Sequence, residues 1–376
     1  MTSPFKFLDS YNKNDAKRFF GRERETAQLY NAVFASNLTL LYGGSGTGKT
    51  SLINCGLANK FYDTDWYPLF IRRGRNVNES LHTALKKAMK NPSDVFDNLT
   101  IEEKIEAVYR DNYRTVFLIF DQFEELFVLG NTEEAQTFYN TVQRILDSKY
   151  SKIKAKIIIS IREEWIAYLH EFEQKVPYLL ENRLRVERMD DRNLFKVVGG
   201  TLKSANIGIE DPATTIGLIL NNIRDKKEGV DLTNLQVYLD RVYRSVLEKS
   251  PDNILSHNTV PVSNNADTIS DTTDNTQIFF TPSVVQRVGA MSNVISQFLD
   301  EQFGDIETRL NERGVKPSKG VPLEILFTLI SNDNTKRQMN IDAILENLPQ
   351  NMQIKTDDIH FCLTEFKRIR ILKETE

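Results

Sequence analysis

The sequence predicts an α/β domain with three layers, followed by domains built from helices. Three observations favour this fold class. Short apolar segments alternate with helical patterns through the first half of the chain, and a glycine-rich turn joins the first of these segments to a helix. From residue 191 onward, the pattern becomes helical. Alternating strands and helices are typical of a parallel sheet that helices cover on both faces.

Five short apolar segments are expected to form the strands of the sheet, at residues 38–42, 66–71, 115–120, 156–160 and 183–189. The third and fourth are almost continuously apolar, which is typical of strands buried on both faces of a parallel sheet. Helical patterns precede the first strand and separate several of the others, at residues 23–35, 50–59, 79–90 and 100–110. The last of these helices opens with Thr-Ile-Glu-Glu, the spacing of a capping box. The α/β domain therefore covers residues 20–190, after an N-terminal arm at 1–19.

The remaining chain is expected to form two further domains. A helical domain covers residues 191–249 and continues at 278–320. The intervening residues 250–277 are rich in Ser, Asn, Thr and Asp. Because such a segment buries too little apolar surface to offset its ordering entropy, we predict a disordered insertion. Residues 321–376 show three short helices in succession, the pattern of a winged-helix domain whose wing is barely reached before the chain stops.

The overall composition narrows the class of protein. A chain of 376 residues with 40% hydrophobic and 27% charged residues is typical of a protein with two or three globular domains. The formal net charge of −4 provides no global positive field for nucleic acid or an acidic membrane. The two cysteines are far apart, no apolar signal segment opens the sequence, and no apolar run reaches roughly 18 residues. We therefore expect a cytoplasmic protein without a membrane span.

The glycine-rich turn "GGSGTGKT" follows the first apolar strand and matches the P-loop pattern, GxxxxGK followed by Thr or Ser. Its glycines allow successive N–H groups to point at one anion, and the helix that follows adds its positive N-terminal end. Lys49 can reach the β- and γ-phosphates, and the hydroxyl of Thr50 can bind Mg²⁺. We therefore predict a P-loop NTPase domain whose phosphate contacts are Gly43, Gly44, Ser45, Gly46, Thr47, Gly48, Lys49, Thr50 and Ser51.

The segment "TVFLIFDQFEELF" carries three candidate acids. Asp121 follows a buried strand, at the edge where parallel α/β sheets bind ligands, and fits the Walker B acid that holds Mg²⁺. The alternative is a solvated acid that closes a strand. Glu124 or Glu125 could orient the attacking water as the general base, and the sequence does not choose between them. Acids at the exposed start of a helix would give the same pattern.

Arg162 follows the apolar run of the fourth strand. If this strand lies between the strands that carry the P-loop and Asp121, Arg162 points toward the γ-phosphate and could report its presence. Otherwise it is a surface arginine paired with Glu163 or Glu164.

Together these residues resemble the STAND class of P-loop NTPases, particularly its novel bacterial group. The match includes "FFGRERE" at 19–25, the P-loop, "DQFEEL" at 121–126 and the arginine at 162, in the order of the family. The segment "LQVYLDRVY" at 235–243 resembles part of its helical domain, and "FKRIRIL" resembles part of its winged helix. The resemblance covers nearly the whole chain apart from 250–277.

The resemblance implies that ATP or ADP is the nucleotide, with Mg²⁺, and that Phe20, Gly21 and Arg22 line the base and ribose end. It also implies nucleotide-dependent self-association and a separate sensor or effector domain or protein. Two features depart from the family pattern. No proline precedes the "LQ" helix, so its contact with the base stays open. The chain also ends at Glu376, before the family's histidine motif, so we expect a shortened chain or a missing sensor domain.

The function that follows is a signal-transduction switch. In this hypothesis the ADP or ATP state and slow Mg²⁺-dependent hydrolysis control domain opening and oligomerisation, and family precedent suggests a role in bacterial stress or antiphage defence. One alternative is an AAA+ ATPase of the replication-initiator type that binds DNA. Gln122 stands where those proteins place Glu, and the candidate recognition helix starts with two acids, which argues against nucleic acid as a partner. The other alternative is a scaffold that retains nucleotide without hydrolysing it.

Overall fold

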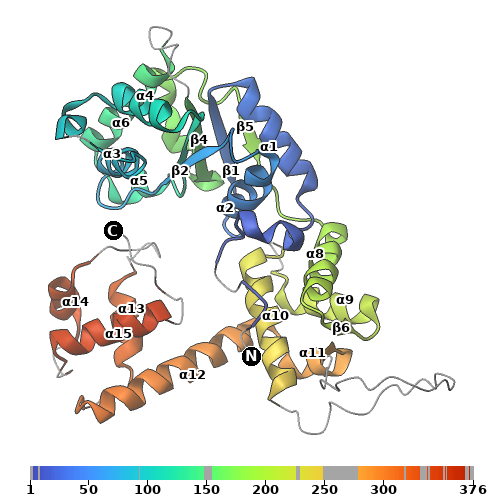
Figure 1. Ribbon diagram of the computed structural model, residues 1–376. Coiled ribbons are helices and arrows are strands. Elements are labelled where there is room, and N and C mark those ends of the chain that lie inside the picture. Colours follow the sequence, from blue (N-terminus) through green and yellow to red (C-terminus); the bar gives the residue numbers. More distant parts are fainter. Residues whose placement is uncertain are drawn as a thin grey trace, which may run out of the picture. The chain divides into compact units, whose positions relative to one another are not determined.

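The computed structural model describes residues 3–6, 9–92, 94–147, 155–225, 229–248, 278–316, 319–330, 337, 339–349, 352, 354–368 and 372. The predicted insertion at 250–277 lies outside the described residues. The chain divides into two compact units, whose helices and strands are labelled in Figure 1. One unit comprises Met1–Arg22 and Arg188–Val294, and the other comprises Glu23–Glu187 and Ile295–Glu376.

Residues 23–187 form a five-stranded parallel sheet, which confirms the predicted fold class for this part of the chain. The strands are β1 (Leu38–Gly43), β2 (Tyr67–Ile71), β3 (Val116–Phe120), β4 (Ala155–Arg162) and β5 (Arg183–Arg185), in the order β2-β3-β4-β1-β5. Strand β4 therefore lies between β3 and β1. This is the strand order that the sequence analysis required for Arg162 to point toward a γ-phosphate.

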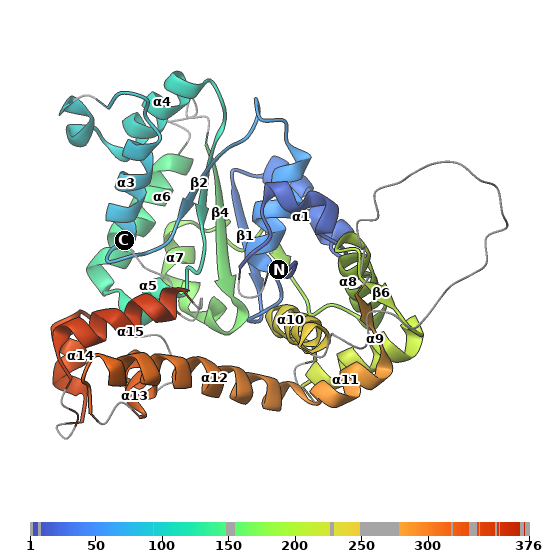
Figure 2. The same cartoon turned by 60° about the horizontal axis from the view of Figure 1, so that its bottom comes forward.

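Helices cover both faces of this sheet (Figure 2). They are α1 (Glu23–Ala35), α2 (Lys49–Ser51), α3 (Val77–Lys87), α4 (Ile101–Asn112), α5 (Glu125–Leu129), α6 (Thr132–Leu146) and α7 (His170–Lys175). Helix α1 lies on one face, and α3, α4 and α6 lie on the other. Alternate strand residues such as Leu118 and Ile157 are buried in the same core as Leu81 of α3 and Ile105 of α4. The period of two in the strands thus produces the three layers.

Two local features test the sequence patterns. At the start of α4, the Oγ1 of Thr100 accepts from the N–H of Glu103, and the Glu103 carboxylate accepts from the N–H of Thr100. This is the predicted capping box. The helix expected at 50–59 is less regular, because α2 continues as a π-helical segment, Leu52–Leu57, and a 3₁₀ turn, Ala58–Lys60.

The other unit is mainly helical and includes the N-terminal arm. It contains α8 (Asp191–Ser204), α9 (Pro212–Ile223), α10 (Leu232–Leu247) and α11 (Pro282–Val288). Two short strands, β6 (Gly208–Ile209) and β7 (Phe279–Phe280), pair in parallel and were not predicted. The arm is part of the core of this unit, since the buried ring of Phe5 packs against Tyr243 and Phe280.

Helix α12 (Met291–Glu312) precedes three shorter helices, α13 (Val321–Thr328), α14 (Ile341–Asn347) and α15 (Thr356–Arg368). Ile359, Cys362 and Phe366 of α15 are fully buried and pack with Ile306 and Leu310 of α12. The three short helices were predicted, whereas the winged-helix assignment stays a prediction. None of the helices that the structure describes combines the length and apolar character needed to cross a membrane.

Candidate phosphate-binding site

The P-loop connects the end of β1 to the start of α2. Its backbone depends on glycine, because Gly46 and Gly48 have φ angles of 67° and 89°, in the left-handed region that other residues rarely adopt. At Gly43 the constraint is space, because an added Cβ would lie 2.3 Å from the carbonyl oxygen of Val186. The loop thus has the conformation and the close packing that its glycines predict.

Lys49 begins α2 and turns its side chain toward the start of the loop. Its Nζ donates to the carbonyl oxygens of Gly43, at 2.6 Å, and Gly44, at 3.0 Å. Burial lowers the pKa of Lys49 from its ordinary value, while the nearby Glu124 acts in the opposite direction and Arg162 adds to the lowering. To contact a phosphate, the ammonium group must exchange these carbonyl acceptors for phosphate oxygens.

Thr50 and Asp121 come from separate motifs and meet at the carboxyl edge of the sheet. The Thr50 hydroxyl is 3.1 Å from one carboxylate oxygen of Asp121 and 3.0 Å from the other. Asp121 follows the end of β3, and only 6% of the residue is exposed. It is therefore not a solvated acid at the end of a strand. Thr50 and Asp121, which were predicted to share a Mg²⁺ ion, are therefore hydrogen-bonded to each other.

Arg162 lies at the end of β4, in register with Gly43 on the neighbouring strand β1. Its Nε is 3.1 Å from a carboxylate oxygen of Glu124, and its backbone N–H donates to the other oxygen at 3.2 Å. The contact of Arg162 with Glu164 is longer, at 4.0 Å, and Glu163 pairs with Arg185 instead. The surface pairing considered for Arg162 is therefore a minor contact.

The structure separates the two candidate bases. Glu124 is 7% exposed and bound to Arg162, whereas Glu125 begins α5 and is only partly buried. Gln122 precedes them with a φ angle of 59°, an uncommon conformation for a residue with a side chain. The N–H of Phe123 then donates to the carbonyl oxygen of Ser160 on β4, at 2.9 Å. This turn directs Glu124 toward the end of β4.

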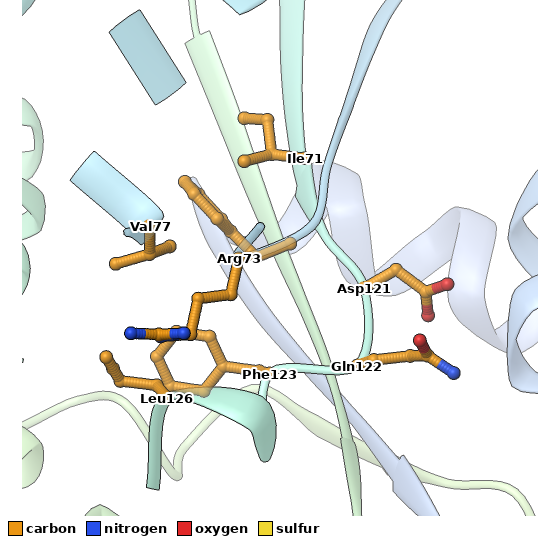
Figure 3. A pocket seen from close by; sticks show the side chains of 8 residues that line it. Ile71, Arg73, Val77, Asp121, Gln122, Phe123 and Leu126 are labelled. Atoms are coloured by element: carbon orange, nitrogen blue, oxygen red, sulfur yellow. The ribbon is translucent and has the colours of Figure 1, made fainter. Parts of the chain in front are cut away.

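Two arginines after β2 were missed by the sequence analysis. Arg72 donates to a carboxylate oxygen of Asp121 at 3.0 Å, and Arg73 forms a buried pair with Glu134 of α6 at 2.7 Å. Figure 3 shows a small pocket in which Arg73 and Phe123 lie on one side of the loop while Asp121 points to the other. The signal that identified Arg162, a cation directly after an apolar strand, is also present in "YPLFIRRGR".

The residues expected at the base end belong to the other compact unit. Within that unit the ring of Phe20 packs on α8, where a Cβ added to Gly200 would lie 2.7 Å from it. Gly21 has a φ angle of 78° and is closely surrounded by Val197 and Met189, and Arg22 is 3% exposed. Their contact with a base stays a prediction.

A magnesium ion fits the donor set at Thr50 and Asp121. Among the described residues, no group of three or more His, Cys, Asp or Glu side chains could hold a metal. Mg²⁺ commonly uses one or two carboxylates and completes its coordination with phosphate oxygens and water. One carboxylate beside one hydroxyl at a P-loop is compatible with such a set, and a Mg²⁺ ion bound there would need phosphate oxygens and water to complete its coordination.

These features define a P-loop NTPase fold: a parallel sheet with β4 between β1 and β3, and a glycine-rich loop and an acid at its carboxyl edge. The model of the protein family described as Novel STAND NTPase 1 matches residues 4–260 of this chain. The chain belongs to this family, which confirms the resemblance.

Solved structures with the same fold share little sequence with this chain. A Walker-type ATPase of Pyrococcus abyssi is 14% identical, with 97% of this chain and 93% of that chain covered and a TM-score of 0.50. The ORC2 protein of Aeropyrum pernix, solved as ADPNP–ADP complexes, is 12% identical, with coverages of 98% and 100% and a TM-score of 0.51. Among the curated proteins, no sequence matches the chain.

Proposed function

We propose that this chain is an ATP-binding switch of the STAND type, with slow, regulatory ATP hydrolysis. The observation that carries the proposal is the hydrogen bond between Thr50 of the P-loop and Asp121 at the end of β3, at 3.0–3.1 Å. Two motifs that were assigned separately to one Mg–nucleotide complex therefore meet in space. The family and the shared fold support an ATPase at the coarser level.

Each residue near the loop has a role that follows from its chemistry. Lys49 binds the β- and γ-phosphates through charge-assisted hydrogen bonds, and the loop amides complete the anion site. Thr50 and Asp121 hold Mg²⁺, which supplies positive charge to the phosphate oxygens. Glu124 is the general base, because its carboxylate is buried beside the loop, and its charge acts on Lys49.

Arg162 connects nucleotide sensing to catalysis in this proposal. It now binds Glu124, at 3.1 Å. Turning its guanidinium to a γ-phosphate releases this carboxylate to orient water, whereas ADP provides no γ-phosphate for the exchange. A ligand shifts an equilibrium only through unequal affinity for the two states, typically about 1–3 kcal/mol. Arg162 supplies such a difference between ATP and ADP.

The finer parts of the function rest on family precedent. We propose that the ATP state opens the domains for assembly of several copies of this chain, in response to a separate sensor and in defence or stress signalling. The direct experiment identifies the nucleotide that co-purifies with the protein and then measures particle mass with ADP and with a non-hydrolysable ATP analogue. A mass increase with the analogue alone supports the switch. Equal masses would contradict nucleotide-controlled assembly.

The sensor role of Arg162 has its own test. Arg162→Ala is expected to bind ADP nearly normally but to lose its preference for ATP, by about tenfold if one charge-assisted contact is lost. Calorimetric titration with both nucleotides measures this preference. Equal losses for ATP and ADP would remove the sensor role while leaving nucleotide binding intact.

A further inference from the structure

Arg72 binds the same carboxylate that the proposed magnesium site requires. Its guanidinium is 3.0 Å from Oδ2 of Asp121. We propose that Arg72 is a positioning residue that competes with a divalent cation for Asp121 and thereby sets the metal concentration at which nucleotide becomes metal-bound. This inference rests on the proposed function of the site as a Mg–nucleotide site.

The backbone fixes Arg72 beside Asp121. Ile71, the last residue of β2, pairs in register with Phe120, the last residue of β3, so the next residues on the two strands are neighbours. The N–H of Asp121 also donates to the carbonyl oxygen of Ile71 at 3.0 Å. These contacts hold the Cα of Arg72 close to Asp121.

Arg73 holds the chain on the other side of Arg72. Its guanidinium pairs with the buried carboxylate of Glu134 at 2.7 Å, and its carbonyl oxygen accepts from the hydroxyl of Ser80 at 2.7 Å. Because Arg73 is anchored in this way, Arg72 has a fixed starting point and only its side chain is free to change partner.

The surroundings of the pair favour exchange of one cation for another. The Asp121 side chain is 7% exposed, whereas that of Arg72 is 44% exposed. A guanidinium that is nearly half exposed returns to water at little cost, since such pairs contribute modestly to stability. A divalent cation attracts the carboxylate more strongly than one delocalised positive charge does.

The metal and Arg72 compete because the Asp121 carboxylate has only two oxygens, and both already accept hydrogen bonds. Asp121 accepts the Thr50 hydroxyl on both oxygens and the Arg72 guanidinium on Oδ2. A metal that uses this carboxylate meets a positive charge already in contact with one oxygen, and the two cations repel each other. Removing the arginine therefore strengthens metal binding, in contrast to the loss expected when a ligand is removed.

The test measures binding of Mn²⁺ as the metal probe, by electron paramagnetic resonance, with saturating ADP. Arg72→Ala is expected to bind Mn²⁺ about three- to tenfold more tightly than the unmodified protein, the range of a partly screened charge contact. Arg72→Gln, which keeps a polar side chain without charge, is expected to give the same direction and serves if the alanine variant fails to fold.

Arg144→Ala is the matched control. Arg144 forms the same kind of pair, 2.6 Å from the buried carboxylate of Glu102, with 49% of its side chain exposed. It lies on α6 and pairs with α4, so its removal is expected to leave Mn²⁺ binding unchanged. A shift in this control as large as that of Arg72→Ala would overturn the specific competition at Asp121.

The outcomes separate the inference from the function on which it rests. If the unmodified protein binds Mn²⁺ with ADP and Arg72→Ala has the same or weaker affinity, the role of Arg72 is wrong and the nucleotide site stands. If Asp121→Asn binds Mn²⁺ as tightly as the unmodified protein, or if the protein with ADP binds no Mn²⁺, the proposed metal site itself is wrong, together with the role of Arg72.

Discussion

Two regions of this chain contain the same kind of arginine–carboxylate pair in different settings. At the edge of the sheet, Arg72 and Arg162 bind Asp121 and Glu124, with arginine side chains 44% and 38% exposed. In the C-terminal helices, Arg309 binds Glu365 at 2.7 Å and Arg313 lies 3.6 Å from Asp358, with arginines 45% and 44% exposed. The acids are 7–10% exposed in all four pairs.

The difference lies in what surrounds each pair. In the C-terminal helices, both guanidiniums also lie over the ring of Phe361 in α15, at 4.8 and 4.9 Å from its centroid, with Arg309 on α12 and Arg313 directly after it. At the sheet edge, Arg72 follows the end of β2 and Arg162 ends β4, and a glycine-rich turn and a lysine lie beside them. Pair geometry is therefore alike in the two regions, and the exchange proposed for Arg72 and Arg162 rests on the second possible partner at the sheet edge, a metal or a phosphate.

The largest expected effect tests whether the sheet edge binds phosphate at all, because without phosphate the two regions would not differ in function. Lys49→Ala is expected to weaken ADP or ATP binding about a thousandfold, because two charge-assisted contacts of about 2 kcal/mol each are lost. The fold is expected to remain, since these contacts are local. The nucleotide released on denaturation, identified by chromatography, measures retention, and a melting curve checks the fold. Normal retention in this variant would contradict the site.

A second test sharpens the distinction between the two neighbouring acids of the site. Glu124→Gln is expected to slow phosphate release about a hundredfold, the lower range for loss of a general base. Glu125→Gln is the matched control and is expected to leave the rate within about threefold, as for a helix-start acid outside the reaction. Single-turnover phosphate release compares the variants. No change in either variant would favour the scaffold that retains nucleotide without hydrolysing it.

Glycine substitutions should have opposite effects in the two regions. Gly43→Ala places a methyl group 2.3 Å from a backbone oxygen, which cannot rotate away, so we expect a loss of about 2 kcal/mol in the free energy of unfolding. Gly304, within α12, has no atom within 4 Å of an added Cβ. Gly304→Ala is therefore expected to stabilise by about 0.5–1 kcal/mol. Denaturant unfolding measures both changes, and equal signs would contradict this contrast.

The smallest expected effect compares the arginines themselves. Arg309→Ala should reduce the free energy of unfolding by about 1–2 kcal/mol, because it removes an ion pair and a cation–π contact from a buried acid and a ring. Arg72→Ala should cost less than about 1 kcal/mol, since Asp121 keeps the Thr50 hydroxyl as a hydrogen-bond donor when Arg72 is removed. The order of the two losses, measured by the same unfolding titration, is the prediction, and the reverse order would mean that Arg72 has a structural role.

Patterns of neighbouring residues predicted the parts of the structure that form from interactions close together in the sequence. The strands, the P-loop, Asp121 and the capping box at Thr100 were all found from residues close together in sequence. The position of β4 between β1 and β3 depends on pairing between distant segments, so the sequence stated it only as a condition for Arg162. Strands β6 and β7 have two residues each, too few to show a period of two.

The candidate site shows the same limit. The choice between Glu124 and Glu125 depends on a turn whose left-handed residue, Gln122, carries no glycine signal. Arg72 escaped notice because its partner Asp121 lies 49 positions later in the chain. The strand register that brings them together follows from the whole sheet. The positions of Phe20, Gly21 and Arg22 relative to a base stay predictions from the family.

The left-handed turn at Gln122 has a consequence for how this loop can vary. It divides a short acidic stretch so that Asp121 is presented to Thr50 and Arg72, while Glu124 is presented to the end of β4. An insertion or deletion of a single residue between the acids would take at least one of them away from its partner at once. This loop should therefore accept glycine or asparagine at Gln122, residues that favour this conformation, far more readily than any change in length.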